Sequence, residues 1–119
     1  KGILSIKNQS KELQGQELAL LYALLDSSTH PISKTIKKYL PIQKSIFLDN
    51  IKQVSSQGMM AWYDGKQLLG GNSQFLKDNG VNVYFDSDYT VYHFAYDGVL
   101  LTSFELEDQI KDDAKELVK

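Results

Sequence analysis

The residues that most often carry catalytic or metal chemistry are sparse in this 119-residue sequence. The two histidines, His30 and His93, lie far apart and there is no cysteine, so the ligand spacing of a zinc site is missing. No nucleophile elbow distinguishes one serine from the others. We therefore expect neither a metal site nor a catalytic residue within the chain.

The common phosphate-binding motifs are absent as well. The nearest approach to a P-loop, Gly65-Lys66-Gln67, lacks the upstream glycine and the following hydroxyl. The remaining glycines do not form the dinucleotide-binding pattern G-x-G-x-x-G. All thirteen basic residues are lysine, so no guanidinium group is available for a bidentate phosphate contact. Any phosphate contact must come from lysine or from backbone N–H groups.

The composition indicates one globular domain. The hydrophobic share is 42%, which fits a single core in a chain of this length. The formal net charge of -2 gives no electrostatic footprint for a polyanion, so nucleic acid is not an expected partner. No apolar run approaches the roughly 20 residues that are needed to cross a bilayer. The absence of cysteine is compatible with a reducing compartment.

The candidate residues that remain stand where predicted elements begin. His30 and Pro31 open a helix, Gly58 begins a strand, and Gly71-Asn72 precedes a short helix. Each of them also has a purely structural interpretation, with His30 as a helix cap, Gly58 as an ordinary strand entry and Asn72 as an N-cap. From residue type alone, a capping or half-buried His30 is favoured.

The first part of the chain predicts two helices. Apolar residues recur at helical spacing from Leu18 to Leu25 and predict a helix over about residues 14–26. Pro31 suits the first turn of a second helix, over about residues 31–40, because its missing N–H would have no partner there.

Beyond Pro41 the apolar pattern changes from the helical period toward alternation, which predicts strands. Asp64-Gly65 and Asp97-Gly98 separate apolar segments, and Asp-Gly in this setting is a strong hairpin signal. A short helix over about residues 72–78 with Gly80 as its left-handed stop, and a C-terminal helix over residues 108–119, complete the expected elements. The predicted fold class is α+β, an antiparallel sheet covered by helices.

Taken in order, these segments resemble the nucleotide-binding domain of heavy-metal-transporting P-type ATPases, the copper-type ATPase group. The likeness is carried by residues 28–36, 58–66 and 69–72, which read STHPISKTI, GMMAWYDGK and LGGN. It implies a twisted antiparallel sheet of about six strands flanked by helices. It also implies a nucleotide-binding domain over residues 1–107 and the start of the phosphorylation domain over residues 108–119.

The resemblance implies a role in ATP-driven transport. The chain would bind ATP, as Mg-ATP in the parent protein, and direct its phosphate chain at an aspartate in a neighbouring domain. The parent would be a membrane-embedded heavy-metal pump, with copper favoured on family prevalence, and this part its cytoplasmic domain. The phosphorylation and actuator domains would be its partners. The isolated chain is expected to bind ATP without full turnover because the phosphoryl-accepting aspartate is not in it.

The same resemblance implies a set of nucleotide-contacting residues. His30 would lie beside the adenine ring, and Gly58 would leave room for the nucleotide next to the backbone. Backbone N–H groups near Gly71 and Asn72 would face anionic oxygens. The implied nucleotide-binding residues are Asp26, Ser28, His30, Pro31, Gly58, Met60, Gly71 and Asn72.

Four positions depart from the family's pattern, among them Gln109, which replaces the proline after Asp108. Met60 stands where the family has its second glycine, and its side chain would pack against the base or the ribose. Leu25 stands at the acidic position before the histidine, and Asp26 is the expected substitute. Thr29 replaces the glutamate directly before the histidine.

An alternative interpretation is a binding module that adds a protein or peptide strand to an exposed sheet edge, with His30 purely structural. The two interpretations differ in one measurable property, because a module of that kind would show no heat of binding with ATP.

Overall fold

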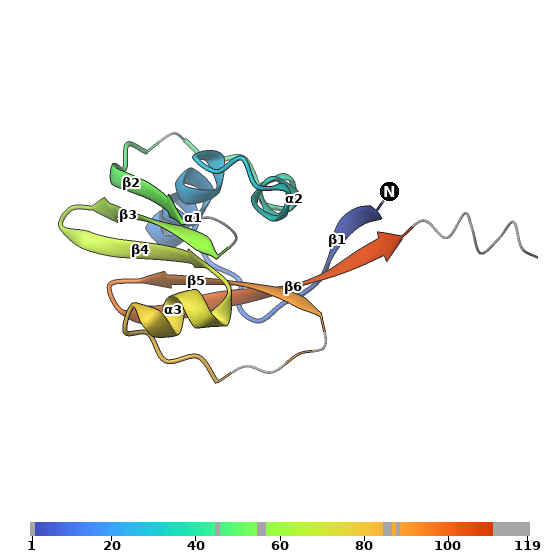
Figure 1. Cartoon of the computed structure of the whole chain (residues 1–119). Helices are drawn as coiled ribbons and strands as arrows, with labels where there is room; N and C mark the ends of the chain where they lie inside the picture. The colour runs from blue at the N-terminus through green and yellow to red at the C-terminus, as the bar shows by residue number, and fades with distance from the viewer. Residues whose placement is uncertain (1, 45, 55–56, 85–86, 88, 111–119) are drawn as a thin grey trace, which may run out of the picture.

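The chain folds as one antiparallel sheet with helices on both faces (Figure 1). The computed structural model describes residues 2–44, 46–54, 57–84, 87 and 89–110. The strands are β1 Gly2–Gln9, β2 Asp49–Val54, β3 Gly58–Tyr63, β4 Lys66–Gly71, β5 Thr90–Tyr96 and β6 Val99–Ile110. The helices are α1 Gly15–Asp26, α2 Pro31–Tyr39 and α3 Ser73–Asp78. The six strands lie in the order β1-β6-β5-β4-β3-β2, which confirms the predicted α+β class and sheet.

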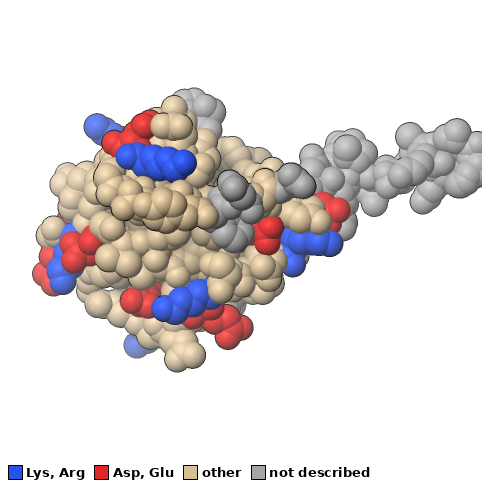
Figure 2. All heavy atoms as spheres, turned by 90° about the horizontal axis from the view of Figure 1, so that it is seen from below, with Lys and Arg blue, Asp and Glu red and all other residues tan. Residues whose placement is uncertain are grey.

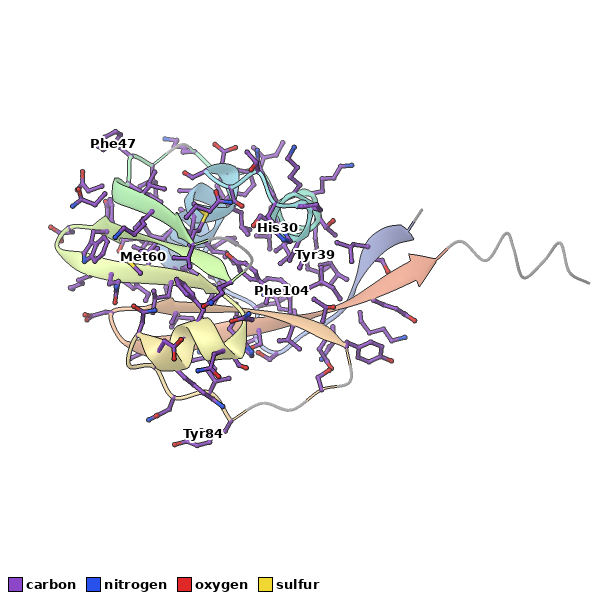
Figure 3. All side chains as sticks on the ribbon, viewed as in Figure 1. His30, Tyr39, Phe47, Met60, Tyr84 and Phe104 are labelled. Atoms are coloured by element: carbon purple, nitrogen blue, oxygen red, sulfur yellow. The ribbon has the colours of Figure 1, made fainter. Side chains whose placement is uncertain are left out.

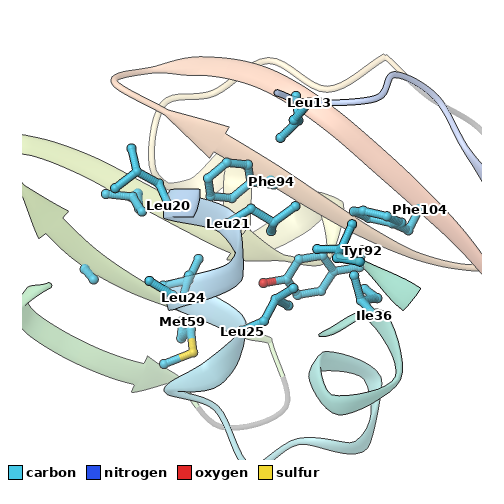
Figure 4. Packing of buried hydrophobic residues seen from close by; sticks show 14 of the residues in the cluster. Leu13, Leu20, Leu21, Leu24, Leu25, Ile36, Met59, Tyr92, Phe94 and Phe104 are labelled. Atoms are coloured by element: carbon cyan, nitrogen blue, oxygen red, sulfur yellow. The ribbon is translucent and has the colours of Figure 1, made fainter. Parts of the chain in front are cut away.

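The two faces of the sheet carry separate hydrophobic clusters. Helices α1 and α2 cover one face and α3 covers the other (Figure 1). The larger cluster, under α1 and α2, includes Leu20, Leu24, Ile36, Phe94 and Phe104 (Figure 4). The smaller cluster, under α3, consists of Leu69, Phe75, Leu76, Val81, Val83 and Ala95. Because successive side chains of a strand point to opposite faces, neighbouring residues in β3, β4 and β5 serve different clusters.

Both predicted Asp-Gly hairpins are present. Asp64 and Asp97 each have a φ of 55°, and Gly65 and Gly98 have φ values of 78° and 81°. Two successive positive φ values are the requirement of a type I′ turn, whose twist matches that of the flanking strands. The turns therefore connect β3 to β4 and β5 to β6 as the sequence predicted.

The helices begin and end close to the predicted residues. The α2 helix has Pro31 at its first position, and α1 ends at Asp26 as expected. Asn72 caps α3, where its side-chain oxygen accepts a hydrogen bond from the Phe75 N–H at 2.8 Å. Gly80 follows with a φ of 88°, the left-handed conformation predicted for the helix stop.

The edge of the sheet near the chain ends differs from the prediction. The prediction of a C-terminal helix that begins at Asp108 is wrong at its start. In the structure, β6 continues to Ile110 and pairs with β1. Strand β1 was not predicted, and its pairing partner lies at the far end of the sequence, where Gly2 faces Ile110 and Leu4 faces Asp108. The rest of the expected helix, residues 111–119, lies outside the described residues. The domain boundary at residue 108 stays a prediction.

Candidate functional site

A cavity of about 220 Å³ opens between the α1–α2 turn and the ends of the four strands β2 to β5. Strands β3 and β4 pair Gly58 with Gly71, and β4 and β5 pair Gly71 with His93, so the start of β3, the end of β4 and the start of β5 meet there. Five of the predicted site residues line this cavity: Ser28, His30, Gly58, Gly71 and Asn72.

His30 is both a helix cap and a wall of the cavity. Its Nδ1 accepts a hydrogen bond from the Ile32 N–H at 3.1 Å, which confirms the capping interpretation. Its own N–H donates to the Ser28 hydroxyl at 3.1 Å, and that serine is buried. Pro31 follows as the first residue of α2, and it is not among the residues that line the cavity. The turn thus fixes the ring while leaving the side chain exposed at the cavity.

Asp26 and Leu25 do not reach the cavity. Leu25 is 1% exposed and belongs to the core under α1. The Asp26 carboxylate accepts a hydrogen bond from the Lys37 ammonium on α2. That hydrogen bond raises the pKa of Lys37 above its ordinary value. The structure therefore places Asp26 in a contact between the two helices rather than among the residues that line the cavity.

Met60 points away from the cavity, contrary to the expectation that it would pack on a ligand there. Its side chain packs against the cluster under α3, and its sulfur lies 3.7 Å from the Gln67 amide nitrogen (Figure 3). Its neighbour Met59 lines the cavity instead and is 3% exposed (Figure 4). The physical reason is the alternation of side chains along β3.

The glycines at the cavity are needed because two backbones approach each other. A Cβ on Gly58 would lie 2.8 Å from both the Gly71 Cα and the Phe75 ring, and one on Gly71 would lie 2.7 Å from the Gly58 Cα. Gly58 was expected to leave room for a ligand. In the structure, protein atoms already occupy the space that its side chain would need, so strand packing explains this glycine without a ligand.

Asn72 uses its polar groups within the protein. Its N–H donates to the Gln57 carbonyl at 3.0 Å, and its side-chain oxygen caps α3. The backbone N–H of Asn72, which was expected to face anionic oxygens, is therefore bonded within the protein instead. The helix α3 is also only six residues long, so its dipole is weak.

Tyr92 is a lining residue that the sequence did not identify as part of a site. The start of β5 lies beside the end of β4 because of the strand register, and the cavity brings it together with the α1–α2 turn. The ring belongs to the core under α1 and is 5% exposed. Its hydroxyl is the one buried side-chain polar atom without a hydrogen-bond partner among the described residues. Burial raises the pKa of this phenol well above its ordinary value.

The cavity is uncharged. Among the described residues that line it, none is Asp, Glu or Lys. Buried groups such as Met59 and Tyr92 form its floor, while exposed polar side chains such as Gln53, Gln57 and Thr90 lie at its rim. Elsewhere, the face seen from below carries acidic and basic side chains in mixed groups (Figure 2). An uncharged cavity of this kind suits a neutral, flat group with polar edges rather than a metal ion.

Two curated proteins match the sequence over most of its length. The copper-exporting P-type ATPase of Vibrio cholerae is 30% identical over 90% of this chain, which spans 13% of that protein. The cadmium, zinc and cobalt-transporting ATPase of Bacillus subtilis is 28% identical over 84% of this chain, which spans 14% of that protein. No protein-family model matches the chain. Among the described residues, none of the helices is long and apolar enough to cross a membrane.

Solved structures with the same fold are N-domains of such pumps. The N-domain of HMA6, a copper-transporting P-type ATPase, has a TM-score of 0.66 and 18% identity, and the match covers 87% of this chain and 98% of that one. The N-domain of HMA8, also copper-transporting, has a TM-score of 0.64 and 20% identity, with 85% and 98% covered. At these identities the structures show the fold alone. The sequence matches and the shared fold point to the same group of proteins. This chain therefore corresponds to the N-domain of heavy-metal-transporting P-type ATPases.

Proposed function

We propose that this chain binds ATP in the cavity at the α1–α2 turn and presents its phosphate chain to an aspartate of a neighbouring domain. The observation that carries the proposal is the uncharged cavity itself, lined by His30, Gly58 and Gly71, in a chain that corresponds to an N-domain. One solved structure with the same fold is the catalytic domain of the CPx-ATPase CopB-B. Its description reports conformational changes in that domain upon nucleotide binding. The fold alone is shared with it, at 17% identity.

The base would take the inner part of the cavity. Met59 and Tyr92 are buried there, and an apolar floor removes the flat faces of a purine from water. His30 would lie beside the base at the entrance. Because its Nδ1 is engaged in the helix cap, the ring orientation is set before the ligand arrives, which lowers the entropy cost of binding.

The ribose and the phosphates would extend past the rim toward solvent. The rim carries the neutral side chains of Gln53, Gln57 and Thr90, so contacts there position the ligand without neutralising its charge. None of the described residues that line the cavity is a carboxylate, so Mg²⁺ of Mg-ATP would be held by phosphate oxygens and by the neighbouring domain. The γ-phosphoryl group would pass there to the aspartate carboxylate, with ADP leaving.

In the parent protein this chain would work on the cytoplasmic side of a membrane-embedded pump. Residues 108–119 would lead into the phosphorylation domain, and the actuator domain would be a further partner. Copper is the cation we propose, since one curated relative and two solved N-domains come from copper-transporting ATPases.

Calorimetry on two His30 variants tests the proposal. His30→Asn keeps a side-chain oxygen that can cap α2 but removes the ring, whereas His30→Ala removes both. We expect ATP affinity to fall about tenfold in both variants, and the unfolding temperature to fall only in His30→Ala. Full ATP affinity in His30→Asn would leave the ring with a structural role alone. Absence of any heat with the unaltered chain would remove the function.

A sheet edge that binds protein or peptide is the second candidate. Strand β2 lies at one edge of the sheet, and its residues are largely exposed. Phe47, just before it, is 83% exposed, and Ile51 within it is 46% exposed. Such an edge can accept an added strand. A chain that gives no heat with ATP would favour this second function.

A further inference from the structure

Several polar atoms at the cavity are already used by the fold or closed off from a ligand. The His30 Nδ1 accepts the hydrogen bond that caps α2, and the Ser28 hydroxyl accepts one from the His30 N–H. The Asn72 side-chain oxygen caps α3. The Tyr92 hydroxyl is enclosed by protein and does not open to the cavity. These four atoms are therefore not available to a ligand.

Two primary amides remain at the rim. Gln53 lies in β2 and Gln57 directly precedes β3, and both side chains are exposed. Neither amide group has a hydrogen-bond partner among the described residues. A glutamine amide holds donor hydrogens and an acceptor oxygen in one plane, so it can form two hydrogen bonds to one flat ligand. The hydroxyls of Ser33 and Thr90, which also line the cavity, offer only one oxygen each.

The strand register directs Gln53 to the cavity. Gln53 lies opposite Met59 on β3, and Met59 lies opposite Gly70 on β4. Directly opposed residues of an antiparallel pair point to the same face, with Cβ atoms about 5 Å apart. Met59 lines the cavity and packs in the core under α1 (Figure 4). The Gln53 side chain therefore stands beside the apolar floor of the cavity.

Gln57 is held differently. Its N–H donates to the Val54 carbonyl at 3.1 Å, and its carbonyl accepts from the Asn72 N–H at 3.0 Å. It is not part of the described strand pairs, so no register sets its side chain opposite a residue of the floor. Of the two amides, Gln53 is the one that the sheet places against a base on Met59.

The pattern of donors and acceptors on a purine decides which base suits this amide. The edge of adenine that carries N6 and N7 presents one donor and one acceptor, whereas the same edge of guanine presents the two acceptors O6 and N7. A glutamine amide matches adenine with both of its groups, because its oxygen accepts from N6 and its nitrogen donates to N7. With guanine, the amide oxygen would face another acceptor.

We propose that Gln53 is the specificity-determining residue of the cavity, and that its amide selects adenine through paired hydrogen bonds to N6 and N7. The proposal rests on the proposed function and adds to it the residue that distinguishes adenine from guanine. The contact needs no charged group, in keeping with the uncharged lining among the described residues.

The variant Gln53→Ala and its matched control Gln57→Ala test this role. ATP and GTP carry the same phosphate chain, so the ratio of their affinities, measured by calorimetry, reports on the base alone. We expect the unaltered chain and Gln57→Ala to favour ATP by about tenfold, and Gln53→Ala to bind the two nucleotides within about twofold of each other. Equal affinities in the unaltered chain would overturn the inference, as would a preference for ATP that survives in Gln53→Ala.

The analogue 7-deaza-ATP, which has a carbon in place of N7, isolates one of the two hydrogen bonds. The unaltered chain is expected to bind it about threefold to tenfold more weakly than ATP. Gln53→Ala should bind the analogue and ATP equally, because the donor to N7 is already gone. The same loss in both proteins would place the partner of N7 elsewhere and overturn the inference.

Failure of this inference differs from failure of the proposed function. Because Gln53 is exposed and its amide has no partner among the described residues, Gln53→Ala should keep the unfolding temperature of the unaltered chain. If His30→Asn loses ATP affinity while Gln53→Ala keeps the preference for ATP, only the role of Gln53 is removed. If the unaltered chain binds neither ATP nor GTP, both fail.

Discussion

Two adjacent residues of β5 show how the two faces of this sheet differ. Tyr92 points to the face under α1 and α2, and His93 is its neighbour along the strand. Both are buried, yet the His93 Nδ1 lies 2.7 Å from the Ser103 hydroxyl on β6, while the Tyr92 hydroxyl has no partner among the described residues. His93 is thus tied into the sheet, and Tyr92 borders a cavity. The polar groups of the two faces thus differ, because the His93 ring has a partner across the sheet, whereas the Tyr92 hydroxyl lies among apolar side chains of the core.

The largest effect should come from the glycines that hold the cavity strands together. Gly71→Ala forces the backbones of β3 and β4 apart, because the new Cβ would lie 2.7 Å from the Gly58 Cα. We expect a loss of about 3 kcal/mol in the free energy of unfolding, measured with denaturant. The control Gly80→Ala meets no atoms within 4 Å and has only its positive φ to strain it, so about 1 kcal/mol is expected. Equal costs for the two would contradict the close packing at the cavity.

The next prediction is that the free energy of unfolding depends on pH through the titration of His93. Burial, with a smaller contribution from Lys77, lowers the pKa of His93 to about 4. Between the ordinary value near 6.5 and about 4, the unfolded chain binds a proton that the folded chain does not. Stability should therefore fall by about 3 kcal/mol as the pH drops through this range, and should be independent of His93 above it.

Denaturant unfolding at a series of pH values measures this change. The variant His93→Gln should show a flatter profile between pH 6.5 and 4, because its amide does not titrate there. An identical slope in the variant and the unaltered chain would assign the pH dependence to other groups.

The smallest effect concerns the partner of His93. Ser103→Ala removes the hydroxyl that meets the His93 ring, and we expect a loss of about 1 kcal/mol in unfolding free energy. Tyr92→Phe should cost nothing in the same assay, since no bond is lost. A neutral Ser103→Ala together with a destabilising Tyr92→Phe would contradict this difference between the two faces of the sheet.

The sequence predicted the parts of the fold that depend on local chemistry. Asp-Gly pairs adopt positive φ at both turns, and Asn72 caps α3, because these residues need only their neighbours. Strand β1 was missed because its partner, β6, lies at the other end of the chain. The expected helix at Asp108 failed for the same reason, since pairing with β1 continues β6 to Ile110.

The candidate site was predictable only in part. Ser28, His30, Gly58, Gly71 and Asn72 come together at the cavity, as the resemblance to the pump family implied. The sequence alone did not show which residues of β3 point to which side of the sheet. Met60 points to the side under α3, and Met59 lines the cavity in its place. Tyr92 could not be found at all without the register that sets β5 beside β4.

Titration of ATP into the isotopically labelled chain shows whether a nucleotide occupies the cavity at the α1–α2 turn. We expect the amide signals of His30, Gly58 and Gly71, which line the cavity, to shift. The amide signals of Gly65 and Gly98, in hairpin turns away from the cavity, should stay unchanged. If the shifts were confined to those turns or to the edge strand β2, and the cavity amides did not move, the nucleotide would not bind in this cavity.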